Sequence, residues 1–438
     1  MPRQLFGTDG IRGVAGEPPL DQPTVYAFGA ALGEWVSHHS NPTVVIGMDT
    51  RESGQWLAET VAAGLARSGA RATFAGLTTT PGVAHLARVE DFAAGVMISA
   101  SHNPFQDNGL KVFDHTGFKL PDSTEHDLES RIFSLLQQSH PPARLALVPD
   151  PAYDRHYVEF LASSFPGSLR GVRLVLDCAN GAASYLGPEL FSGLGAEVIA
   201  LGCSPDGRNI NQECGALHVD GLRRRVLAER AHLGAAFDGD ADRCIMVSAS
   251  GRIIDGDHAL LIAARRLRPQ SVVATVMSNL GLERALAADG IGLIRTAVGD
   301  RYVIEEMLRA GLPLGGEQSG HVIFRRYSTT GDGMLTALRV LESLIESGVA
   351  LDKMVEDFVV YPQKLVNVRF AVKRPIEELA GVQAEIRAAE AEFGDAGRVL
   401  VRFSGTEPLA RVMVEGPTAD RVDERASAIA GAIRLALC

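Results

Sequence analysis

Thr43-Val-Val-Ile-Gly-Met48 is a short run of mostly β-branched and apolar residues, which favours a buried β-strand. It continues into the polar segment Asp49-Thr-Arg-Glu-Ser53 and then into a helical pattern from about Gln55 to Ser68. A strand, a polar loop and a helix in this order are typical of an α/β unit with parallel strands. This stretch therefore predicts the fold class.

Two later stretches repeat the same order. Val172-Arg-Leu-Val-Leu-Asp177 runs into Cys178-Ala-Asn-Gly-Ala182 and a helix, and Ser271-Val-Val-Ala-Thr-Val276 runs into Met277-Ser-Asn-Leu-Gly281 and a third helix. The recurrence of one pattern along a chain indicates a repeated architecture. We expect three similar α/β domains with mixed, largely parallel sheets.

The pattern changes after Pro362. The segments Leu365–Val372, Arg398–Phe403 and Arg411–Val414 have the composition of strands, and a helical pattern runs from about Ala419 to Leu437. These elements predict a small C-terminal α+β domain. Breaks near Pro141-Pro142 to Asp150, near Ser250-Gly251 and near Tyr361-Pro362 give the expected domains 1–150, 151–250, 251–362 and 363–438.

The composition is that of an ordinary globular protein, with 46% hydrophobic and 22% charged residues. The net charge of −11 argues against a surface that binds nucleic acid or an anionic membrane. There is no apolar signal region and no apolar run long enough to span a bilayer. The five cysteines are odd in number and include no Cys-x-x-Cys pair, which argues against a disulfide framework or a zinc site. We expect a cytoplasmic location.

Asp238-Gly-Asp-Ala-Asp-Arg243 places three carboxylates at alternate positions after an apolar run. In extended backbone these side chains point to the same side, so Asp238, Asp240 and Asp242 can converge on one cation. Ligands that are all oxygen suit a hard divalent ion, and Mg²⁺ is the usual one where phosphate is also bound. An EF-hand loop is excluded, because its sixth and twelfth positions are Arg243 and Ala249 instead of Gly and Glu. A solvated acidic turn is the alternative.

Ile98-Ser-Ala-Ser-His-Asn-Pro104 offers a hydroxyl nucleophile, Ser101, on a turn after another apolar run. A plain turn is the alternative, since Ser-His and Asn-Pro are common turn formers. No Gly-x-Ser-x-Gly motif is present, which argues against an acyl-transfer serine. A serine that carries phosphate beside a Mg²⁺ site is a phosphoryl-transfer centre, and the two segments together predict one.

Further motifs accompany these two segments in a fixed order: Phe6-Gly-Thr-Asp-Gly-Ile-Arg-Gly13, Gly315-Gly-Glu-Gln-Ser-Gly-His321, and Arg402-Phe-Ser-Gly-Thr-Glu-Pro408 followed by Arg411. With them, essentially the whole chain resembles the α-D-phosphohexomutase family. Two positions depart from the family pattern. Many members have Gly where this chain has Ala241, and members often have Lys or Pro where it has Phe403. The spacing of the aspartates and the Ser-Gly-Thr stretch are unchanged.

The resemblance implies four domains around a central cleft and an isomerase that interconverts glucosamine 6-phosphate and glucosamine 1-phosphate, a step toward cell-wall amino-sugar precursors. Phosphorylated Ser101 would give its phosphoryl group to the sugar phosphate, and it would take back the other phosphate of the resulting bisphosphate. One Mg²⁺ per chain would be held by Ser101 and the three aspartates. The implied partners are a sugar phosphate and a sugar bisphosphate, with no nucleic acid and no membrane. Both monomers and homodimers occur in the family.

The resemblance also implies roles for individual residues. Lys111, Arg12 and His321 are candidates for the general acid and base by motif position. His102 is a further catalytic candidate, although its position next to Ser101 does not make it a base for that hydroxyl. On residue type alone, a lysine is more often on the surface and a lone histidine more often structural. Arg243 could steady the phosphoryl group. Glu317 and Ser319 would contact the sugar, and the set that would bind the non-transferring phosphate is Arg402, Ser404, Gly405, Thr406 and Arg411.

The substrate is the least specific part of this interpretation. The whole-chain pattern, which includes Asn209-Ile-Asn-Gln-Glu-Cys-Gly215 and lacks extra insertions, resembles the subgroup of the family that acts on the amino sugar. A 2-amino group differs from a 2-hydroxyl group by one contact only, so the alternative is a phosphomannomutase/phosphoglucomutase that acts on hexose phosphates. A non-catalytic sugar-phosphate-binding protein would be expected to lack Ser101 or one of the aspartates, and all four residues are present.

Overall fold

The computed structural model describes residues 4–7, 9–138, 141–403 and 408–437. It consists of two units, and each is described by itself. The first contains Met1–Met277 and Leu293–Val355, and the second contains Ser278–Gly292 and Glu356–Cys438. Among the described residues, no helix has both the length and the apolar character needed to cross a membrane.

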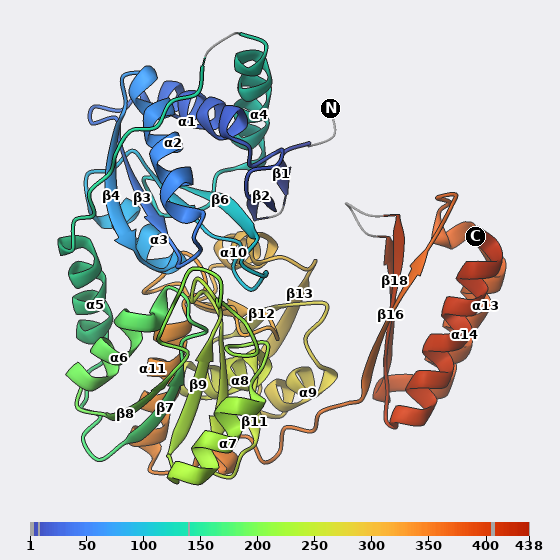
Figure 1. Cartoon of the computed structure of the whole chain (residues 1–438). Coiled ribbons are helices and arrows are strands. Elements are labelled where there is room, and N and C mark those ends of the chain that lie inside the picture. The colour runs from blue at the N-terminus through green and yellow to red at the C-terminus, as the bar shows by residue number, and fades with distance from the viewer. Residues whose placement is uncertain (1–3, 8, 139–140, 404–407, 438) are drawn as a thin grey trace. The chain divides into compact units, whose positions relative to one another are not determined.

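The first α/β domain is built on a six-stranded sheet in the order β1-β2-β6-β5-β3-β4 (Figure 1). β3 pairs in parallel with β4 and β5, and the remaining pairs are antiparallel. Helices cover both faces of β3, because Val44 and Ile46 pack into the cluster of α1 and α2 while Val45 packs against α3. The elements are β1 (Phe6–Gly7), β2 (Gly10–Val14), α1 (Gln22–Val36), β3 (Thr43–Met48), α2 (Gly54–Arg67), β4 (Arg71–Leu77), α3 (Thr80–Val89), β5 (Ala94–Ile98), β6 (Asp107–Asp114) and α4 (Asp122–Leu136).

The second α/β domain has a five-stranded sheet in the order β11-β10-β9-β7-β8. β7 pairs in parallel with β8 and β9, whereas β9, β10 and β11 form an antiparallel edge. The turn between β9 and β10 is the acidic segment 238–243. The elements are α5 (Ala152–Ser164), β7 (Arg173–Asp177), α6 (Ala183–Gly193), β8 (Glu197–Leu201), α7 (Asp220–Glu229), β9 (Leu233–Phe237), β10 (Cys244–Ser248) and β11 (Ile253–Ile254).

The third sheet has the order β13-β12-β14-β15. β12 and β14 are parallel, and β14 and β15 form an antiparallel hairpin whose turn is 317–321. The elements are α8 (Gly256–Leu267), β12 (Ser271–Thr275), β13 (Gly292–Thr296), α10 (Asp300–Arg309), β14 (Leu314–Gly316), β15 (Val322–Phe324), α11 (Gly333–Ser347) and α12 (Leu351–Met354).

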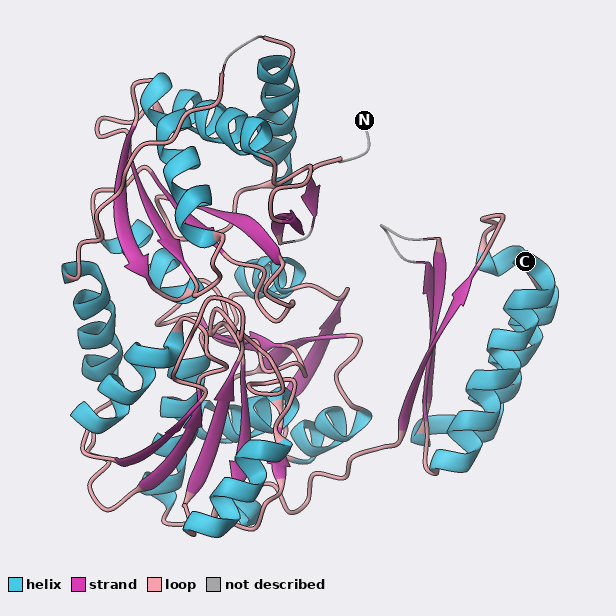
Figure 2. Ribbon diagram, viewed as in Figure 1, coloured by secondary structure: helices cyan, strands magenta, loops and turns pink. Residues whose placement is uncertain are grey.

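The second unit is an antiparallel sheet in the order β16-β18-β17 with α13 and α14 packed on it (Figure 2). Helix α9 belongs to this unit, because its first amide, of Leu280, donates to Glu415 Oε1 at 2.9 Å. The elements are α9 (Leu280–Ala288), β16 (Gln363–Arg369), two short 3₁₀ turns (Ile376–Glu378 and Gly394–Ala396), α13 (Ala380–Phe393), β17 (Arg398–Phe403), β18 (Leu409–Glu415) and α14 (Ala419–Leu437).

The predicted fold class is confirmed: there are three α/β domains with mixed sheets and a small α+β domain. In each of the three large sheets, parallel strands continue into antiparallel strands toward an edge. The ends of β3, β17 and α14 fall where the sequence pattern predicted them, and the other predicted elements differ from the observed ones by a few residues.

Asp332 begins α11 and links it to α5. Its side chain accepts hydrogen bonds from the Leu335 amide at 2.9 Å and from the Tyr157 hydroxyl at 2.8 Å. The carboxyl is almost completely buried. Burial raises the pKa of Asp332 to about 6, although these two hydrogen bonds oppose the rise.

We expect Asp332→Asn to gain stability relative to the wild type as the pH rises. A carboxyl whose pKa is raised on folding stabilises the folded state at low pH, and this contribution is lost from about pH 4 through about pH 6. The difference between the two free energies of unfolding should change by about 3 kcal/mol over this range. Urea unfolding of both proteins at several pH values between about 4 and 7 measures it. A difference that does not vary with pH would contradict the expectation.

Candidate active site

The Ser101 turn follows β5 at the carboxyl end of the first sheet. Ser101 is 1% exposed and has a φ of 53°, in the left-handed region that few residues other than Gly adopt. Its Oγ donates to Asp238 Oδ2 at 2.6 Å, and its amide donates to Ser99 Oγ at 2.9 Å. Ser99 Oγ in turn donates to Asp49 Oδ2 at 2.5 Å. The hydroxyl is therefore held inside the protein against the acidic turn of the second sheet.

The acidic turn brings its three carboxylates together. Asp238, Asp240 and Asp242 are all buried, and one oxygen of each lies within 4.8 Å of one oxygen of the others. Ala241, within this turn, adopts a φ of 57°. Gly would adopt this conformation without the cost that a Cβ imposes, roughly 1 kcal/mol. The turn closes nonetheless, because the Ala241 amide donates to the Asp238 carbonyl at 3.0 Å.

This cluster could bind a metal ion. Oδ1 of Asp240 and Oδ1 of Asp242 are buried and have no hydrogen-bond partner among the described residues. Burial, together with the nearby charges of Asp242 and Asp240, raises the pKa of Asp238 well above its ordinary value. The site thus disfavours three ionised carboxylates on their own, and a cation would offset this. An all-oxygen set of ligands suits a hard divalent cation.

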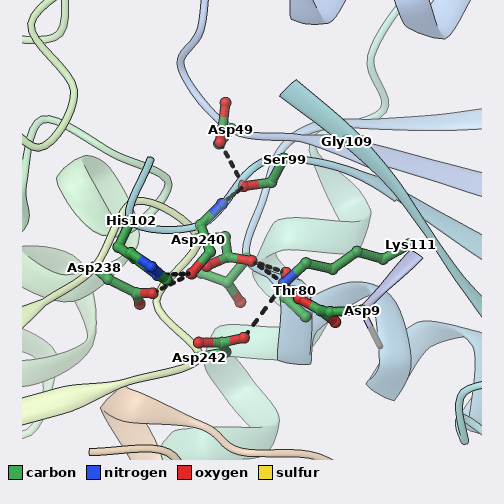
Figure 3. Close-up of polar contacts among 12 residues, drawn as sticks. Asp9, Asp49, Thr80, Ser99, His102, Gly109, Lys111, Asp238, Asp240 and Asp242 are labelled. Atoms are coloured by element: carbon green, nitrogen blue, oxygen red, sulfur yellow. Dashed lines mark hydrogen bonds and ion pairs between the residues drawn. The ribbon is translucent and has the colours of Figure 1, made fainter. Parts of the chain in front are cut away.

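Lys111, on β6, supplies the nearest positive charge (Figure 3). Its Nζ lies 2.8 Å from Asp240 Oδ2, 3.0 Å from Asp9 Oδ2 and 3.4 Å from Asp242 Oδ2. The side chain is 1% exposed, and burial opposes the ammonium form. The carboxylates of Asp240, Asp9 and Asp242 outweigh this effect and raise the pKa of Lys111. Lys111 is therefore a buried cation and hydrogen-bond donor beside the acidic cluster.

His321 lies between two carboxylates. Its Nδ1 is 3.6 Å from Asp242 Oδ1 and its Nε2 is 3.5 Å from Asp300 Oδ2, and the Gly331 amide donates to Nε2 at 2.9 Å. Burial lowers the pKa of this imidazole, but Asp242 and Asp300 raise it overall. Both ring nitrogens thus face groups of the protein, and a role of His321 in proton transfer stays a prediction.

His102 lies next to the Ser101 hydroxyl, and Arg243 contacts His102. Arg243 Nη1 donates to His102 Nδ1 at 3.1 Å, and that nitrogen is 3.3 Å from Ser101 Oγ. Burial, Arg243 and Arg12 lower the pKa of His102 to about 4, so its imidazole is neutral near pH 7. The Arg12 guanidinium is partly buried and pairs with Asp9, which also accepts from Lys111.

The predicted sugar-contacting turn lies next to the acidic turn. The Cys244 amide, directly after that turn, donates to the Gly320 carbonyl at 3.1 Å. Glu317 Oε1 accepts from the Gly299 amide at 3.1 Å, and Ser319 Oγ lies 3.4 Å from Glu317 Oε2. Glu317 is half-buried and Ser319 is exposed. Both polar side chains are thus brought close to the acidic cluster by the β14–β15 hairpin.

The two predicted phosphate-binding arginines lie on neighbouring strands of the second unit. Arg402 of β17 and Arg411 of β18 are directly opposite each other in the antiparallel register, so their side chains share one face of the sheet. Burial and the charge of Arg411 lower the pKa of Arg402. Two adjacent guanidiniums favour an anion. Ser404, Gly405 and Thr406 lie outside the described residues.

Comparison with known proteins identifies the family. Four models of the phosphoglucomutase/phosphomannomutase family match in order: alpha/beta/alpha domain I at residues 3–139, domain II at 153–251, domain III at 255–361 and the C-terminal domain at 365–432. The chain belongs to the phosphoglucomutase/phosphomannomutase family.

Among its relatives in this family, the phosphoglucosamine mutase of Solibacter usitatus is 57% identical over 99% of both chains. The phosphoglucosamine mutase of Koribacter versatilis is 48% identical over 99% of this chain and 97% of the other. A family protein of known structure from Burkholderia thailandensis has a TM-score of 0.82 at 25% identity and covers 100% of this chain and 98% of its own. Aspergillus fumigatus N-acetylphosphoglucosamine mutase, in complex with GlcNAc-6P and magnesium, shares the fold with a TM-score of 0.64 at 19% identity, covering 99% and 96%.

Within this phosphoglucomutase/phosphomannomutase fold, the structure brings together most of the residues that the sequence predicted for the chemistry: Ser101, His102, Lys111, Arg12, Asp238, Asp240, Asp242, Arg243 and His321. It also reveals neighbours that the sequence reasoning missed. Asp9 lies inside the motif Phe6–Gly13, and Asp49 directly follows β3. The sequence therefore contained a local signal for both residues. Thr80, Lys119 and Asp300 have no local signal. Thr80 Oγ1 donates to Asp240 Oδ2, and Lys119 pairs with both Asp9 and Asp300.

Proposed function

We propose that this chain is a phosphoglucosamine mutase, which interconverts glucosamine 6-phosphate and glucosamine 1-phosphate through a phosphorylated Ser101 and a sugar bisphosphate. One observation supports the chemistry above all: the buried Ser101 Oγ donates to Asp238 of an all-carboxylate cluster at 2.6 Å. The identity of 57% to the phosphoglucosamine mutase of Solibacter usitatus over 99% of both chains supports the amino sugar as the substrate.

Asp238, Asp240, Asp242 and the phosphorylated Ser101 would hold one Mg²⁺ ion. A bound divalent cation neutralises charge on the phosphoryl oxygens and polarises the phosphorus. A phosphoserine carries about −1.5 to −2 charges near neutral pH, and it would stand beside three carboxylates. The two buried oxygens without hydrogen bonds, Asp240 Oδ1 and Asp242 Oδ1, fit this role.

The reaction consists of two phosphoryl transfers. In the first, an oxygen of the sugar bonds to the phosphorus of phospho-Ser101 as the bond from that phosphorus to Ser101 Oγ breaks. The sugar hydroxyl loses its proton to a base, and the released Ser101 Oγ takes up a proton. The product is the bisphosphate. In the second, Ser101 Oγ loses its proton and bonds to the other phosphorus, and the released sugar oxygen takes up a proton. The serine is then phosphorylated again.

We propose that Lys111 is the hydrogen-bond donor to the oxygens of the transferred phosphoryl group. Its ammonium form is favoured by Asp240, Asp9 and Asp242 against the effect of burial, so it can stabilise negative charge and donate hydrogen bonds to the phosphoryl group. Arg12 and Arg243 add two further cations, and the neutral His102 lies beside Ser101 Oγ. Lys111, Arg12 and His321 stay predictions for the acid and base, and His102 stays a predicted catalytic residue.

The remaining predictions complete the proposal. Glu317 and Ser319 would contact the sugar, and the phosphate that is not transferred would bind Arg402, Ser404, Gly405, Thr406 and Arg411. Three further predictions also remain. They are the domain boundaries 1–150, 151–250, 251–362 and 363–438, the cytoplasmic location, and a possible homodimer.

Turnover by the purified protein tests the substrate. Glucosamine 6-phosphate, glucose 6-phosphate and mannose 6-phosphate are each supplied with Mg²⁺ and a trace of the matching bisphosphate. We expect glucosamine phosphate to be isomerised fastest, by a factor of 10 or more in kcat/KM, since a site that pairs with an amino group leaves polar groups unpaired with a hydroxyl. Faster isomerisation of a hexose phosphate would replace the substrate but keep the mechanism. Binding without turnover would contradict the enzyme.

A further inference from the structure

The main chain at Ser101 has a conformation that serine does not favour by itself. Its φ of 53° is unfavourable for a residue with a Cβ. The turn must also keep Ser101 Oγ against Asp238 while phosphate and three carboxylates repel one another. Something other than the local sequence therefore has to fix this backbone.

Two side chains from distant parts of the sequence bind the carbonyl oxygens of the turn. The Ser101 carbonyl accepts from Asn211 Nδ2 at 2.9 Å and from Arg51 Nη2 at 3.2 Å. The Asn103 carbonyl accepts from the same two groups, at 3.1 Å from Asn211 and at 2.6 Å from Arg51. Each side chain thus bridges both carbonyls, and the turn is held at two points two residues apart.

Arg51 is itself fixed by the first sheet. It follows β3, its side chain is 0% exposed, and it forms an ion pair with Asp49. Asp49 also accepts from Ser99, whose Oγ accepts from the Ser101 amide. The amide side and the carbonyl side of Ser101 are therefore tied to the same buried Asp49–Arg51 pair.

Asn211 comes from the second α/β domain, in the quoted segment 209–215. Its φ is 59°, and its amide donates to the Ala179 carbonyl at 2.8 Å. The acidic turn packs against the same place. A Cβ built on Gly239 would lie 2.4 Å from the Ser101 carbonyl oxygen and 3.0 Å from Asn211 Nδ2. Asn211, Gly239 and Ser101 thus fit together without room for another side chain.

We propose that Asn211 and Arg51 are positioning residues that form a two-domain clamp on the Ser101 turn. At the turn they donate to main-chain carbonyls and not to Ser101 Oγ, so they act on the reaction through the placement of Ser101 Oγ beside Asp238. Because Arg51 belongs to the first domain and Asn211 to the second, the turn is held from both sides only where the two domains meet. The clamp deepens the proposed function and rests on it.

Asn211→Gly is the sharpest test, because Gly keeps the left-handed φ and removes both hydrogen bonds. We expect kcat to fall by ~10- to 100-fold, as a misplaced reacting group does, while the KM for glucosamine phosphate changes by less than ~3-fold. The rate at which a sugar bisphosphate phosphorylates Ser101, followed by intact mass, should fall by the same factor as kcat. Glu213→Gly is the matched control. Glu213 has a φ of 52°, is exposed and lies two residues away, and its replacement should leave both rates unchanged.

Arg51→Lys is a second, independent test. The guanidinium pairs with Asp49 through Nη1 and with both carbonyls through Nη2, whereas lysine has one nitrogen for all three partners. It should lower kcat with little change in KM. Rates of Asn211→Gly equal to those of Glu213→Gly, or a loss in kcat no larger than the loss in folded protein measured by thermal unfolding, would overturn the clamp. If the wild type is never phosphorylated on Ser101, the proposed function falls, and the clamp falls with it.

Discussion

Replacing Ser101 by alanine will lower kcat by roughly 10³-fold or more, because the Oγ that carries the phosphoryl group is lost. The hydroxyl is buried, and its hydrogen bond to Asp238 is 2.6 Å long. Steady-state turnover of glucosamine 6-phosphate with Mg²⁺ and a trace of bisphosphate measures the effect.

Two further variants separate chemistry from folding. Ser101→Gly also lacks the hydroxyl but adopts the φ of 53° freely, so it should be equally inactive and more stable than Ser101→Ala by about 1 kcal/mol. Ser163→Ala, which changes an exposed serine on α5, should keep full activity. Turnover by Ser101→Ala within a few-fold of the wild type would exclude a phosphoserine intermediate at this position.

Asp238→Asn is the change with the next largest expected effect. It keeps the shape of the side chain but removes one of three charges from the candidate cation site, and we expect kcat/KM to fall by ~10²-fold or more. Asp238 is also the carboxyl that the site disfavours most in its ionised form, since burial, Asp242 and Asp240 raise its pKa. Without metal, the variant should therefore be at least as stable as the wild type near neutral pH.

Thermal unfolding without Mg²⁺ measures the stability of the variant, and thermal unfolding with Mg²⁺ measures its binding of the cation. Metal at about 100 times its dissociation constant should stabilise the wild type by about 2.7 kcal/mol, whereas Asp238→Asn should gain little. Asp127→Asn, on the exposed face of α4, removes one carboxylate elsewhere and should behave as the wild type does. An equal metal-dependent rise in Tm for Asp238→Asn and the wild type would show that the cation binds elsewhere.

The sequence predicted the parts of the fold and site that depend on local patterns. β3 and β17 have the predicted ends because apolar runs between polar loops specify them directly, and α14 does because its apolar residues recur at helical spacing. The three aspartates could be read as one cluster because the alternation of side chains along an extended strand is a local property. Ser101 stood out for a similar reason, since a hydroxyl on a polar turn after an apolar strand is visible in a single segment.

The rest depends on contacts between distant residues. Thr80 and Asp240 are 160 positions apart, and Asn211 and Ser101 are 110 apart, so no window of sequence contains either pair. The left-handed conformation of Ser101 also had no signal, because a serine is not the residue that this φ usually requires. His321 was a candidate acid or base by its position in a family motif, and only the structure reveals that both of its nitrogens face groups of the protein.

In the proposed mechanism, Ser101 carries the phosphoryl group beside the acidic cluster. The most direct measurement is the intact mass of the purified protein after incubation with glucosamine 1,6-bisphosphate and Mg²⁺, followed by peptide mapping. We predict the gain of one phosphoryl group on Ser101, its absence in Ser101→Ala, and its loss to the sugar when glucosamine monophosphate is added. Isomerisation by a protein that never carries phosphate on Ser101 would contradict the account.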